Sequence, residues 1–318
     1  MAQALVTIGL PIYNGASLCR TAIESVLAQT YPNFELVVSD NCSTDETEDV
    51  CREYARRDSR VRYSKTERNL GSARNCCRTV ELARGEYFRW IAHDDWIHRD
   101  FITECLAVAE ADPEIISVAP IIDIVDRAGI KYQSVVSYTG RASWSSNRIE
   151  QYAQMMDELA YCETHSDGIF MVAYCFALHR LSLLRRTRLL MPFISSDYVL
   201  AAELALWGKL AFVNKPLGVF VRDTGTTPQF VLWNPLAIQH TLDPSRMSKL
   251  DMLISVRRRH FEHVVAVLRS PLSVFEKVLA VEIATRPMRA RVRKRFVAAS
   301  ESGQTPLLIA NCVAHLPM

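Results

Sequence analysis

The residues that decide the fold form one continuous stretch, FELVVSDNCSTDET, residues 34–47. Its first half, Phe34 to Asp40, is short, apolar and rich in β-branched side chains, and turn-forming residues follow it, so it predicts a buried strand. Its second half has the form of a capping box, because Ser43 stands three positions before Glu46. A helix is therefore predicted over Thr44 to Arg57, so the stretch is one strand followed by one helix.

The same alternation extends on both sides of this stretch. Further strands are predicted at Leu5–Gly9, Val61–Lys65, Tyr87–Ala92 and Ile115–Val125, and further helices at Ser17–Gln29, Ser72–Ala83 and Phe101–Ala111. Strands that alternate with helices imply a mostly parallel sheet covered on both faces. We therefore expect an α/β protein whose ligands bind beyond the carboxyl ends of its strands.

The composition is that of a globular chain. The 318 residues are 49% hydrophobic and 23% charged, enough for one large domain or two ordinary ones. No apolar run is long enough to cross a bilayer, and no basic region with an apolar core opens the sequence, so we expect neither a membrane span nor secretion. The nine cysteines include no Cys-x-x-Cys pair, which favours free thiols in a reducing cytosol over disulfides or a zinc site.

The second half of the chain gives weaker patterns. The predicted elements are a loop over Ser134–Asn147, a helix that continues through Met156, a helix over Asp197–Trp207 that ends at Gly208, and a strand or hairpin over Leu210–Arg222 broken by Pro216. After Pro228 the pattern is helical and increasingly basic. Residues 246–318 hold 13 Lys and Arg against five Asp and Glu, so the near-neutral total conceals a basic tail.

Aromatic and polar side chains gather where the predicted strands end. Tyr13 and Asn14 follow the first strand, Asp40 ends the second, and the pair Asp94-Asp95 follows the fourth. A planar base can stack beside Tyr13 while Asp40 accepts a hydrogen bond from a base N–H or a ribose hydroxyl. Two adjacent carboxylates suit a hard divalent cation shared with a diphosphate. These residues predict a site for a nucleotide and a metal ion.

Five sequence blocks occur in order between Val6 and Asp95. They are Val6–Asn14, Ala22–Tyr31, Glu35–Asp45, Asn69–Asn75, and Gly85–Tyr87 with the acidic pair Asp94-Asp95. Together they resemble the opening of the family 2 glycosyltransferases, and a weaker likeness extends to Ser196-Asp197, the helix ending at Gly208, and Arg222. The resemblance implies the GT-A fold, a Rossmann-like, mixed and mostly parallel sheet flanked by helices, with a helical C-terminal extension.

The resemblance also implies a division of the chain and a donor site. Residues 1–225 would form the glycosyltransferase domain, with a nucleotide-binding half at 1–125 and an acceptor and catalytic half at 126–225, and residues 226–318 would form a basic helical extension. The family's donor-binding positions correspond here to Pro11, Tyr13, Asn14 and Asp40 for the base and ribose, and to Asn69, Arg74 and Asp94 for the ribose and diphosphate.

The same resemblance implies the chemistry. Asp94 would bind Mg²⁺ or Mn²⁺, with Asp95 as a second ligand or an orienting group and His93 as a further candidate ligand. Asp197 would be the general base of an inverting transfer, in which an acceptor hydroxyl attacks the anomeric carbon and no covalent sugar–enzyme intermediate forms. The expected partners are a nucleotide-diphospho-sugar donor and a glycan, polysaccharide or lipid-linked acceptor, as in the biosynthesis of cell-envelope glycans.

Two positions depart from the family pattern and keep other hypotheses open. The first Asp of the family's D-x-D motif is Ala92 here, and Thr224 stands where many members have a His near the diphosphate. These departures allow a second hypothesis, a degenerate nucleotide-sugar binder without catalysis. A metal phosphohydrolase built on His93 and Asp94 is a third. Asp197, at a predicted helix start, also has the simpler interpretation of an N-cap.

The end of the chain carries a basic cluster. Residues 286–295 contain six Arg and Lys. A solvated helix end explains such a cluster, but its position after the apolar residues Phe275, Val278 and Leu279 also suits an anionic membrane surface. Nucleic acid is not expected, because no binding motif accompanies the charges. We therefore expect a cytoplasmic protein with peripheral contact at the inner face of the plasma membrane.

Overall fold

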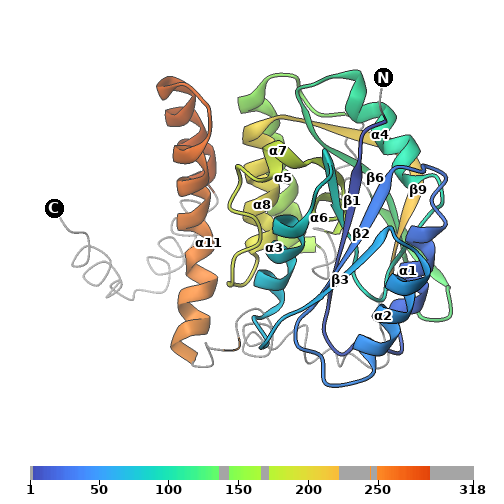
Figure 1. Cartoon of the computed structure of the whole chain (residues 1–318). Helices are drawn as coiled ribbons and strands as arrows, with labels where there is room; N and C mark the ends of the chain where they lie inside the picture. The colour runs from blue at the N-terminus through green and yellow to red at the C-terminus, as the bar shows by residue number, and fades with distance from the viewer. Residues whose placement is uncertain (1–2, 136–142, 166–171, 222–243, 245–248, 287–318) are drawn as a thin grey trace.

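Figure 1 presents the computed structural model of the chain, which describes residues 3–135, 143–165, 172–221, 244 and 249–286. These residues form one nine-stranded sheet with helices on both faces. The strand order is β3-β2-β1-β4-β8-β6-β9-β5, and β7 pairs with β6. Within the described ranges, no helix combines the length and the apolar character needed to span a bilayer.

The first half of the sheet is parallel. β1 (Val6–Ile12) lies between β2 (Phe34–Asp40) and β4 (Tyr87–Trp90), and β3 (Val61–Lys65) lies beside β2. The helices α1 (Cys19–Leu27), α2 (Thr47–Arg57) and α3 (Ser72–Leu82) connect these strands. β1 and β2 are buried along almost their whole length, as strands between two helical layers must be. Ile12 pairs with Asp40, so β1 and β2 end side by side.

The second half of the sheet is mixed. β6 (Ile115–Val125) and β9 (Lys209–Val221) are parallel, whereas β8 (Leu178–Arg180) is antiparallel to both its neighbours, β4 and β6. β5 (Trp96–Ile97) pairs antiparallel with β9, and β7 (Lys131–Val135) with β6. Pro216 does not break the strand as predicted. β9 continues past it, and the pairing with β6 is irregular beside Ile121, where a bulge accommodates a residue without an N–H.

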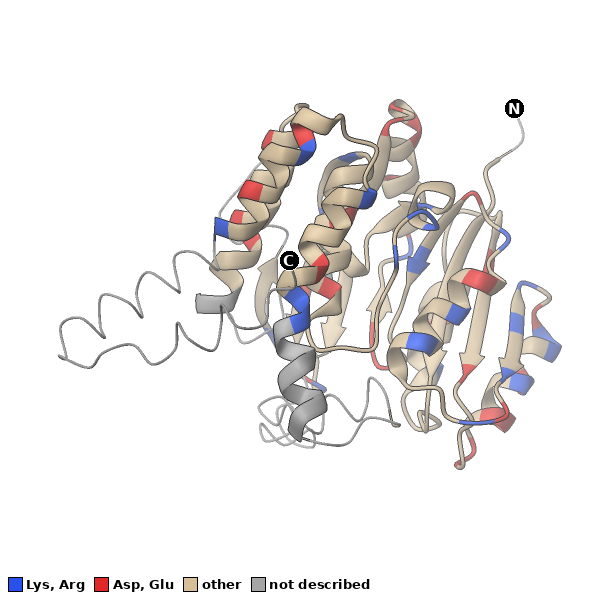
Figure 2. Cartoon of the chain, turned by 90° about the vertical axis from the view of Figure 1, so that its left-hand side faces the viewer, with Lys and Arg blue, Asp and Glu red and all other residues tan. Residues whose placement is uncertain are grey.

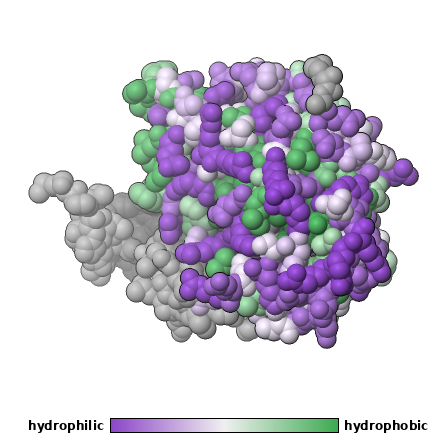
Figure 3. Space-filling view, in the orientation of Figure 1, coloured by the Kyte–Doolittle hydropathy of each residue, from purple (hydrophilic) through white to green (hydrophobic). Residues whose placement is uncertain are grey.

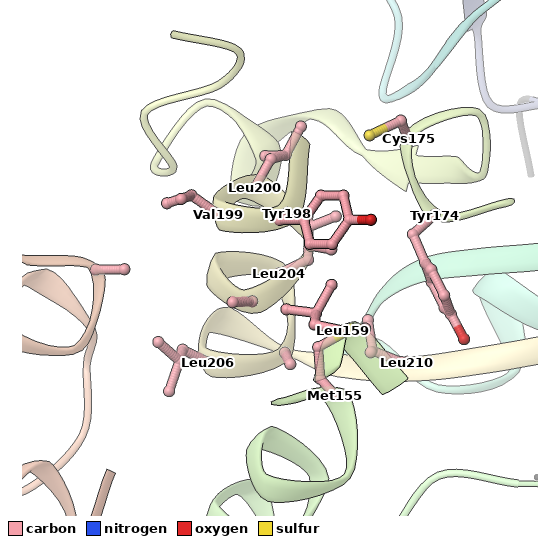
Figure 4. Close-up of a cluster of buried hydrophobic side chains, with 14 of the residues drawn as sticks. Met155, Leu159, Tyr174, Cys175, Tyr198, Val199, Leu200, Leu204, Leu206 and Leu210 are labelled. Carbon is pink, nitrogen blue, oxygen red and sulfur yellow. The ribbon is translucent and has the colours of Figure 1, made fainter. Parts of the chain in front are cut away.

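Two hydrophobic cores cover the two faces of the sheet. One joins the strands to α1, α2 and α4 (Phe101–Ala111). The other joins them to the opposite layer, which consists of α3, α5 (Arg148–His165), α6 (Val172–Cys175), α7 (Leu181–Leu184) and α8 (Ser196–Trp207). Figure 4 shows part of this second core, with Leu204 of α8 beside Leu159 of α5. The predicted α/β fold, with a mostly parallel sheet covered on both faces, is confirmed.

α11 (Lys249–Arg269) lies outside α8 and forms the outermost helical layer in Figure 1. Its inner face contributes Ala266 and Val267 to the second core. The helical residues 274–286 contribute Ala280, Ile283 and Ala284 to the same core. The helical character predicted after Pro228 is therefore present in these residues, and they share a core with the half of the chain that contains α8.

A buried ion network joins α11 to α8. The Arg188 backbone N–H donates to Glu203 Oε2 at 2.9 Å, and its Nη2 donates to the backbone carbonyl of Glu262 at 3.0 Å. Arg188 Nη1 also contacts the Glu262 carboxylate, to which Arg258 Nε donates at 2.6 Å. The Glu203 side chain has no exposed surface, and burial raises its pKa. Because buried charges are stable only when paired, this network fixes α11 against α8.

Candidate active site

A cleft of about 350 Å³ opens at the carboxyl ends of β1, β2 and β4, the edge at which sheets of this kind bind ligands. It is lined by Pro11, Ile12, Tyr13, Asn41, Asn69, Ser72, Asn75, Cys76, His93 and Pro244. Four residues predicted from the sequence are therefore brought together here: Pro11, Tyr13, Asn69 and His93.

The loop after β1 is held by the loop after β2. Asn14 has a φ of 49°, a left-handed conformation that Asn tolerates. Its backbone N–H donates to Ser43 Oγ at 2.9 Å, and its side-chain Oδ1 accepts from Thr44 N at 2.9 Å. Gly15 N also donates to Thr47 Oγ1 at 2.9 Å. Asn14 thus connects two loops, while the half-exposed Tyr13 ring faces the cleft.

These contacts explain why α2 begins three residues later than predicted. Ser43 does not cap the helix, because its hydroxyl accepts from Asn14. The N-cap residue is Glu46, and Asp45 fixes the turn before it, since its Oδ1 accepts from Thr47 N at 3.1 Å while its Oδ2 accepts from Ala16 N at 3.2 Å. Burial opposes ionisation of Asp45, but the bonds from Thr47 and Ala16 outweigh it and lower its pKa. One carboxylate therefore orders the turn that leads into α2 and holds the β1 loop.

Asp40 lies beneath these two loops. Its Oδ1 accepts from Ser43 N at 2.8 Å, and its Oδ2 accepts from the Tyr63 hydroxyl at 2.6 Å. It has no exposed surface and does not line the cleft, whereas the next residue, Asn41, does. The contact with a base or ribose therefore stays a prediction for Asp40, and in this structure its carboxylate orders the loop.

Asn41 is a site residue that the sequence analysis missed, although it stands inside one of the five blocks. Its Oδ1 accepts from Leu70 N at 2.8 Å, and its Nδ2 donates to Asn69 Oδ1 at 2.8 Å. Gly71, with a φ of 84°, then turns the chain into α3. The amide pair thereby fixes the approach to the helix whose start lines the cleft.

The first turn of α3 faces the cleft through Ser72, Asn75 and Cys76. Backbone N–H groups at a helix start favour anions such as a diphosphate. Asn75 also fixes the sheet edge, because its Nδ2 donates to the backbone carbonyl of Ser39 at 2.8 Å. Arg74 lies exposed on this turn and does not line the cleft. Its predicted approach to the diphosphate stays a prediction.

The acidic pair after β4 consists of two unlike carboxylates. Asp95 is buried, and its Oδ1 accepts at 2.9 Å from the N–H of Val221, the last residue of β9. Burial, and then the charge of Asp94, raise the pKa of Asp95 to about 8. Asp94 is half-buried and makes no hydrogen bond to another described residue. Of the two roles predicted for Asp95, this geometry favours the orienting one, and Asp94 is the carboxylate available to a ligand.

Asp94 has the chemistry of a ligand for Mg²⁺ or Mn²⁺, which prefer carboxylate oxygens. In the part of the chain that the structure describes, no three His, Cys, Asp or Glu side chains converge on one point. Magnesium sites that handle phosphates commonly use one or two carboxylates and complete the shell with phosphate oxygens and water. Asp94 follows the cleft residue His93 in the sequence but does not itself line the cleft, and it fits that arrangement as a single protein carboxylate.

Asp197 lies in the first turn of α8 and is half-buried. Burial raises its pKa to about 6, although the backbone N–H groups of Asp197 and Tyr198 and the charge of Arg259 act in the opposite direction. The residue at the N-cap is Ser195, with a φ of 63°, so Asp197 is not the N-cap residue. Asp197 is not among the residues that line the cleft, so its role as the base stays a prediction. Arg222 and Thr224 lie outside the described residues.

The fold and the site agree with three comparisons. Residues 7–180 match the family model described as glycosyl transferase family 2. Because this match covers more than half of the 318 residues, the chain belongs to that family, a family of transferases. The family predicted from the sequence is therefore confirmed.

Curated relatives match a part of the chain. An uncharacterized glycosyltransferase of Rickettsia prowazekii is 44% identical over 91 residues, which are 29% of this chain and 27% of that protein. The putative glycosyltransferase EpsH of Bacillus subtilis is 32% identical over 117 residues, 36% of this chain and 33% of that protein. The chain thus matches about a third or less of the length of these relatives.

Solved structures match more of the chain. Residues 1–349 of S. aureus TarS in complex with UDP superpose with a TM-score of 0.59 and 17% identity, over 88% of this chain and 71% of that one. The TarS complex with UDP-GlcNAc gives a TM-score of 0.59 and 16% identity, over 87% of this chain and 70% of that one. At this identity the likeness supports the fold.

Proposed function

We propose that this protein transfers a sugar from a nucleoside-diphosphate donor to an acceptor hydroxyl, with inversion at the anomeric carbon. The observation that carries the proposal is the single cleft at the strand ends. It brings together an aromatic ring, an amide pair, a helix start and His93, which the half-buried Asp94 follows in the sequence. Membership of family 2 and a fold like that of TarS, which was solved with UDP and with UDP-GlcNAc, support this donor class.

The donor would lie with its base beside Tyr13 and Pro11, and with its ribose near Asn41 and Asn69. Asn14 and Asp40 would act mainly by holding the two loops, because their oxygens already accept bonds from loop N–H groups. The diphosphate would meet the first turn of α3, with Arg74 exposed beside it.

In the proposed reaction Asp197 is the general base. It accepts the proton of the acceptor hydroxyl as that oxygen bonds to the anomeric carbon, and the bond from this carbon to the diphosphate oxygen breaks. A carboxylate with a pKa of about 6 is mostly ionised at neutral pH and is a stronger base than an exposed Asp. Asp94 would hold a divalent cation, whose charge would stabilise the departing diphosphate. Asp95 would keep Asp94 in place through its bond to Val221.

The second hypothesis, a nucleotide-sugar binder without catalysis, is favoured by one observation. Ala92 leaves the acidic motif with a single available carboxylate. The phosphohydrolase hypothesis has no comparable support, because His93 and Asp94 are joined by no third His, Cys, Asp or Glu among the described residues. A glycan, polysaccharide or glycolipid acceptor and a cytoplasmic location at the plasma membrane also belong to this proposal.

The test is transfer and hydrolysis of UDP-, dTDP- and GDP-sugars, with Mg²⁺ or Mn²⁺ and after chelation. The proposal expects release of nucleoside diphosphate that requires the cation and is lost in Asp94→Asn and Asp197→Asn. Glu110→Gln, an exposed carboxylate on α4, is the matched control and should behave as the unmodified protein. Tight donor binding without turnover would support the binder instead.

A further inference from the structure

The outermost helices expose an unusual number of large apolar side chains. Ten large hydrophobic residues are exposed in the described chain, and six of them lie between residues 261 and 279. This helical apolar patch consists of Phe261, Leu268, Val274, Phe275, Val278 and Leu279. Figure 3 shows hydrophobic side chains gathered along the left-hand edge of the molecule, over α11 and residues 270–286. Single exposed apolar residues are ordinary, but a gathered set marks an interaction surface.

The patch is not the core side of these helices. Ala280, Ile283 and Ala284 are buried at helical spacing and face the second core. Phe275 and Val278, 73% and 64% exposed, lie on the other side of the same helix. A surface helix normally has a polar outer face. Residues 274–286 instead have apolar side chains on both faces, and none of the described residues covers the outer one.

The patch is also rigidly presented. Ser273 N donates to Glu276 Oε2 at 2.8 Å, and Glu276 N donates to Ser273 Oγ at 3.3 Å, so a capping box fixes the start of the second helix. The ion network of Arg188 and Glu262 fixes α11 beneath it. In Figure 2, which looks onto this side, charged residues occupy only part of the helical surface.

The charge of the neighbouring sequence indicates which partner fits. Arg269 and Arg286 are exposed at the ends of the patch region. The sequence that follows at once brings the number of Lys and Arg in residues 286–295 to six, with no Asp or Glu among them. A second copy of the chain would bring two such basic segments together, and their like charges would repel. An anionic lipid surface would instead neutralise the charge of the segment.

We propose that the helical apolar patch is a membrane-docking surface that inserts among the acyl chains of an anionic lipid monolayer, for which the exposed Arg269 and Arg286 and the basic composition of residues 286–295 supply complementary charge. Amphipathic helices bind membranes by this combination of apolar insertion and basic charge. Because α11 is the outermost layer, docking through this side leaves the strand-end cleft open to a soluble donor. The proposal does not depend on the reaction proposed above, since lipid binding is measured separately from turnover.

The test is flotation of the purified full-length protein with vesicles of phosphatidylcholine, with and without phosphatidylglycerol. We expect flotation only with phosphatidylglycerol, and a loss of partitioning of about tenfold or more in the double variant Phe275→Ser/Val278→Ser. Neutralising Arg289, Arg291, Arg293 and Arg295 to Gln should reduce binding and its dependence on salt. Ile130→Ser, which removes a 62% exposed apolar side chain from the turn before β7, is the matched control and should float as the unmodified protein does.

Circular dichroism melting should show that the patch variants remain folded, because the replaced side chains are exposed. Failure of the unmodified protein to float with phosphatidylglycerol vesicles would overturn the proposal. Equal flotation of the patch variant would also overturn it. A concentration-dependent dimer in sedimentation velocity that the patch variant abolishes, without vesicle binding, would assign the surface to a second copy instead. Nucleoside-diphosphate release with a soluble acceptor should not change in the patch variant.

Discussion

The donor cleft and the helix that carries Asp197, called the donor side and the base side below, are held by different kinds of interaction. On the donor side, short hydrogen bonds connect adjacent loops, as between Asn14 and Thr44 or between Asp45 and Ala16. On the side of Asp197, α8 is held by core packing and by the buried network of Arg188, Glu203 and Glu262. A single loop hydrogen bond contributes about 1 kcal/mol, whereas breaking one partner of a buried ion pair costs about 3–5 kcal/mol. The donor side is therefore stabilised by many weak hydrogen bonds, whereas the base side depends strongly on one buried ion network.

The largest expected effect separates chemistry from binding. Asp197→Asn removes the proposed base, so kcat should fall by about 10²- to 10⁴-fold. The affinity for UDP should not change, because Asp197 is not among the residues that line the donor cleft. Steady-state release of nucleoside diphosphate and calorimetric titration with UDP measure the two quantities. An unchanged kcat would remove Asp197 from the mechanism.

The next effect tests how strongly the base side depends on its buried ion network. Arg188→Met leaves Glu203 buried without its ion partner and leaves Glu262 with Arg258 alone, so the free energy of unfolding should fall by about 3–5 kcal/mol. Urea denaturation followed by circular dichroism measures it. The matched control is Arg57→Met, which removes an exposed pair with Glu53 on α2 and should change stability by less than about 0.5 kcal/mol. Equal losses in the two variants would contradict the comparison.

The donor side should respond more mildly in stability and more strongly in affinity. Asp45→Ala removes the bonds from Thr47 N and Ala16 N, so the free energy of unfolding should fall by about 1–2 kcal/mol and UDP binding should weaken. Asp49→Ala, an exposed change in the first turn of α2, is the control.

This prediction also has a pH dependence. The folded-state pKa of Asp45 is lowered from 3.8, so its stabilising contribution is present above that pH and is lost as the pH falls through the lowered value. The stability difference between Asp45→Ala and the unmodified protein should therefore disappear in acid. A difference that persists in acid would show that the ionised carboxylate is not its source.

The smallest effect tests the electrostatic contact between α11 and the base. With a pKa of about 6 for Asp197, kcat/KM should fall about tenfold per pH unit below pH 6. Arg259→Met removes a positive charge that lowers this pKa, so the acidic limb should move upward by a fraction of a pH unit. Arg259→Lys should restore it. A limb that does not move would mean that α11 holds α8 through packing and the Arg188 network without affecting the pKa of Asp197.

The sequence predicted the elements of the first 125 residues closely because their signals are local. β2, β3, β6 and α4 have the predicted bounds, since each is a dense apolar or periodic run between clear turn residues. β8 was missed, because three residues that include His179 and Arg180 carry no strand pattern. Its conformation comes from pairing with β4 and β6, which only the assembled sheet provides.

The site residues also fall into two groups: those that a local motif predicts, and those whose environment depends on contacts between distant parts of the sequence. The five blocks identified the cleft residues Pro11, Tyr13 and Asn69, because each belongs to a motif with a fixed position at a strand end or helix start, and His93 was identified as the neighbour of the acidic pair. The bond of Asp95 to Val221 joins positions 126 residues apart. The contact of Arg188 with Glu262 joins positions 74 residues apart. No local spacing encodes such pairs, so the unlike environments of Asp94 and Asp95 could not be predicted.

The bond between Asp95 and Val221 has a consequence for the order in which the protein folds. The short strand that follows Asp95, β5, pairs only with β9 among the described elements, and Trp96 lies opposite Val219. During synthesis the acidic turn leaves the ribosome long before β9 does, and contacts across such a sequence separation form slowly. The parallel half of the sheet can therefore assemble early, while the carboxylate next to Asp94 acquires its buried environment only when the last strand inserts between β6 and β5.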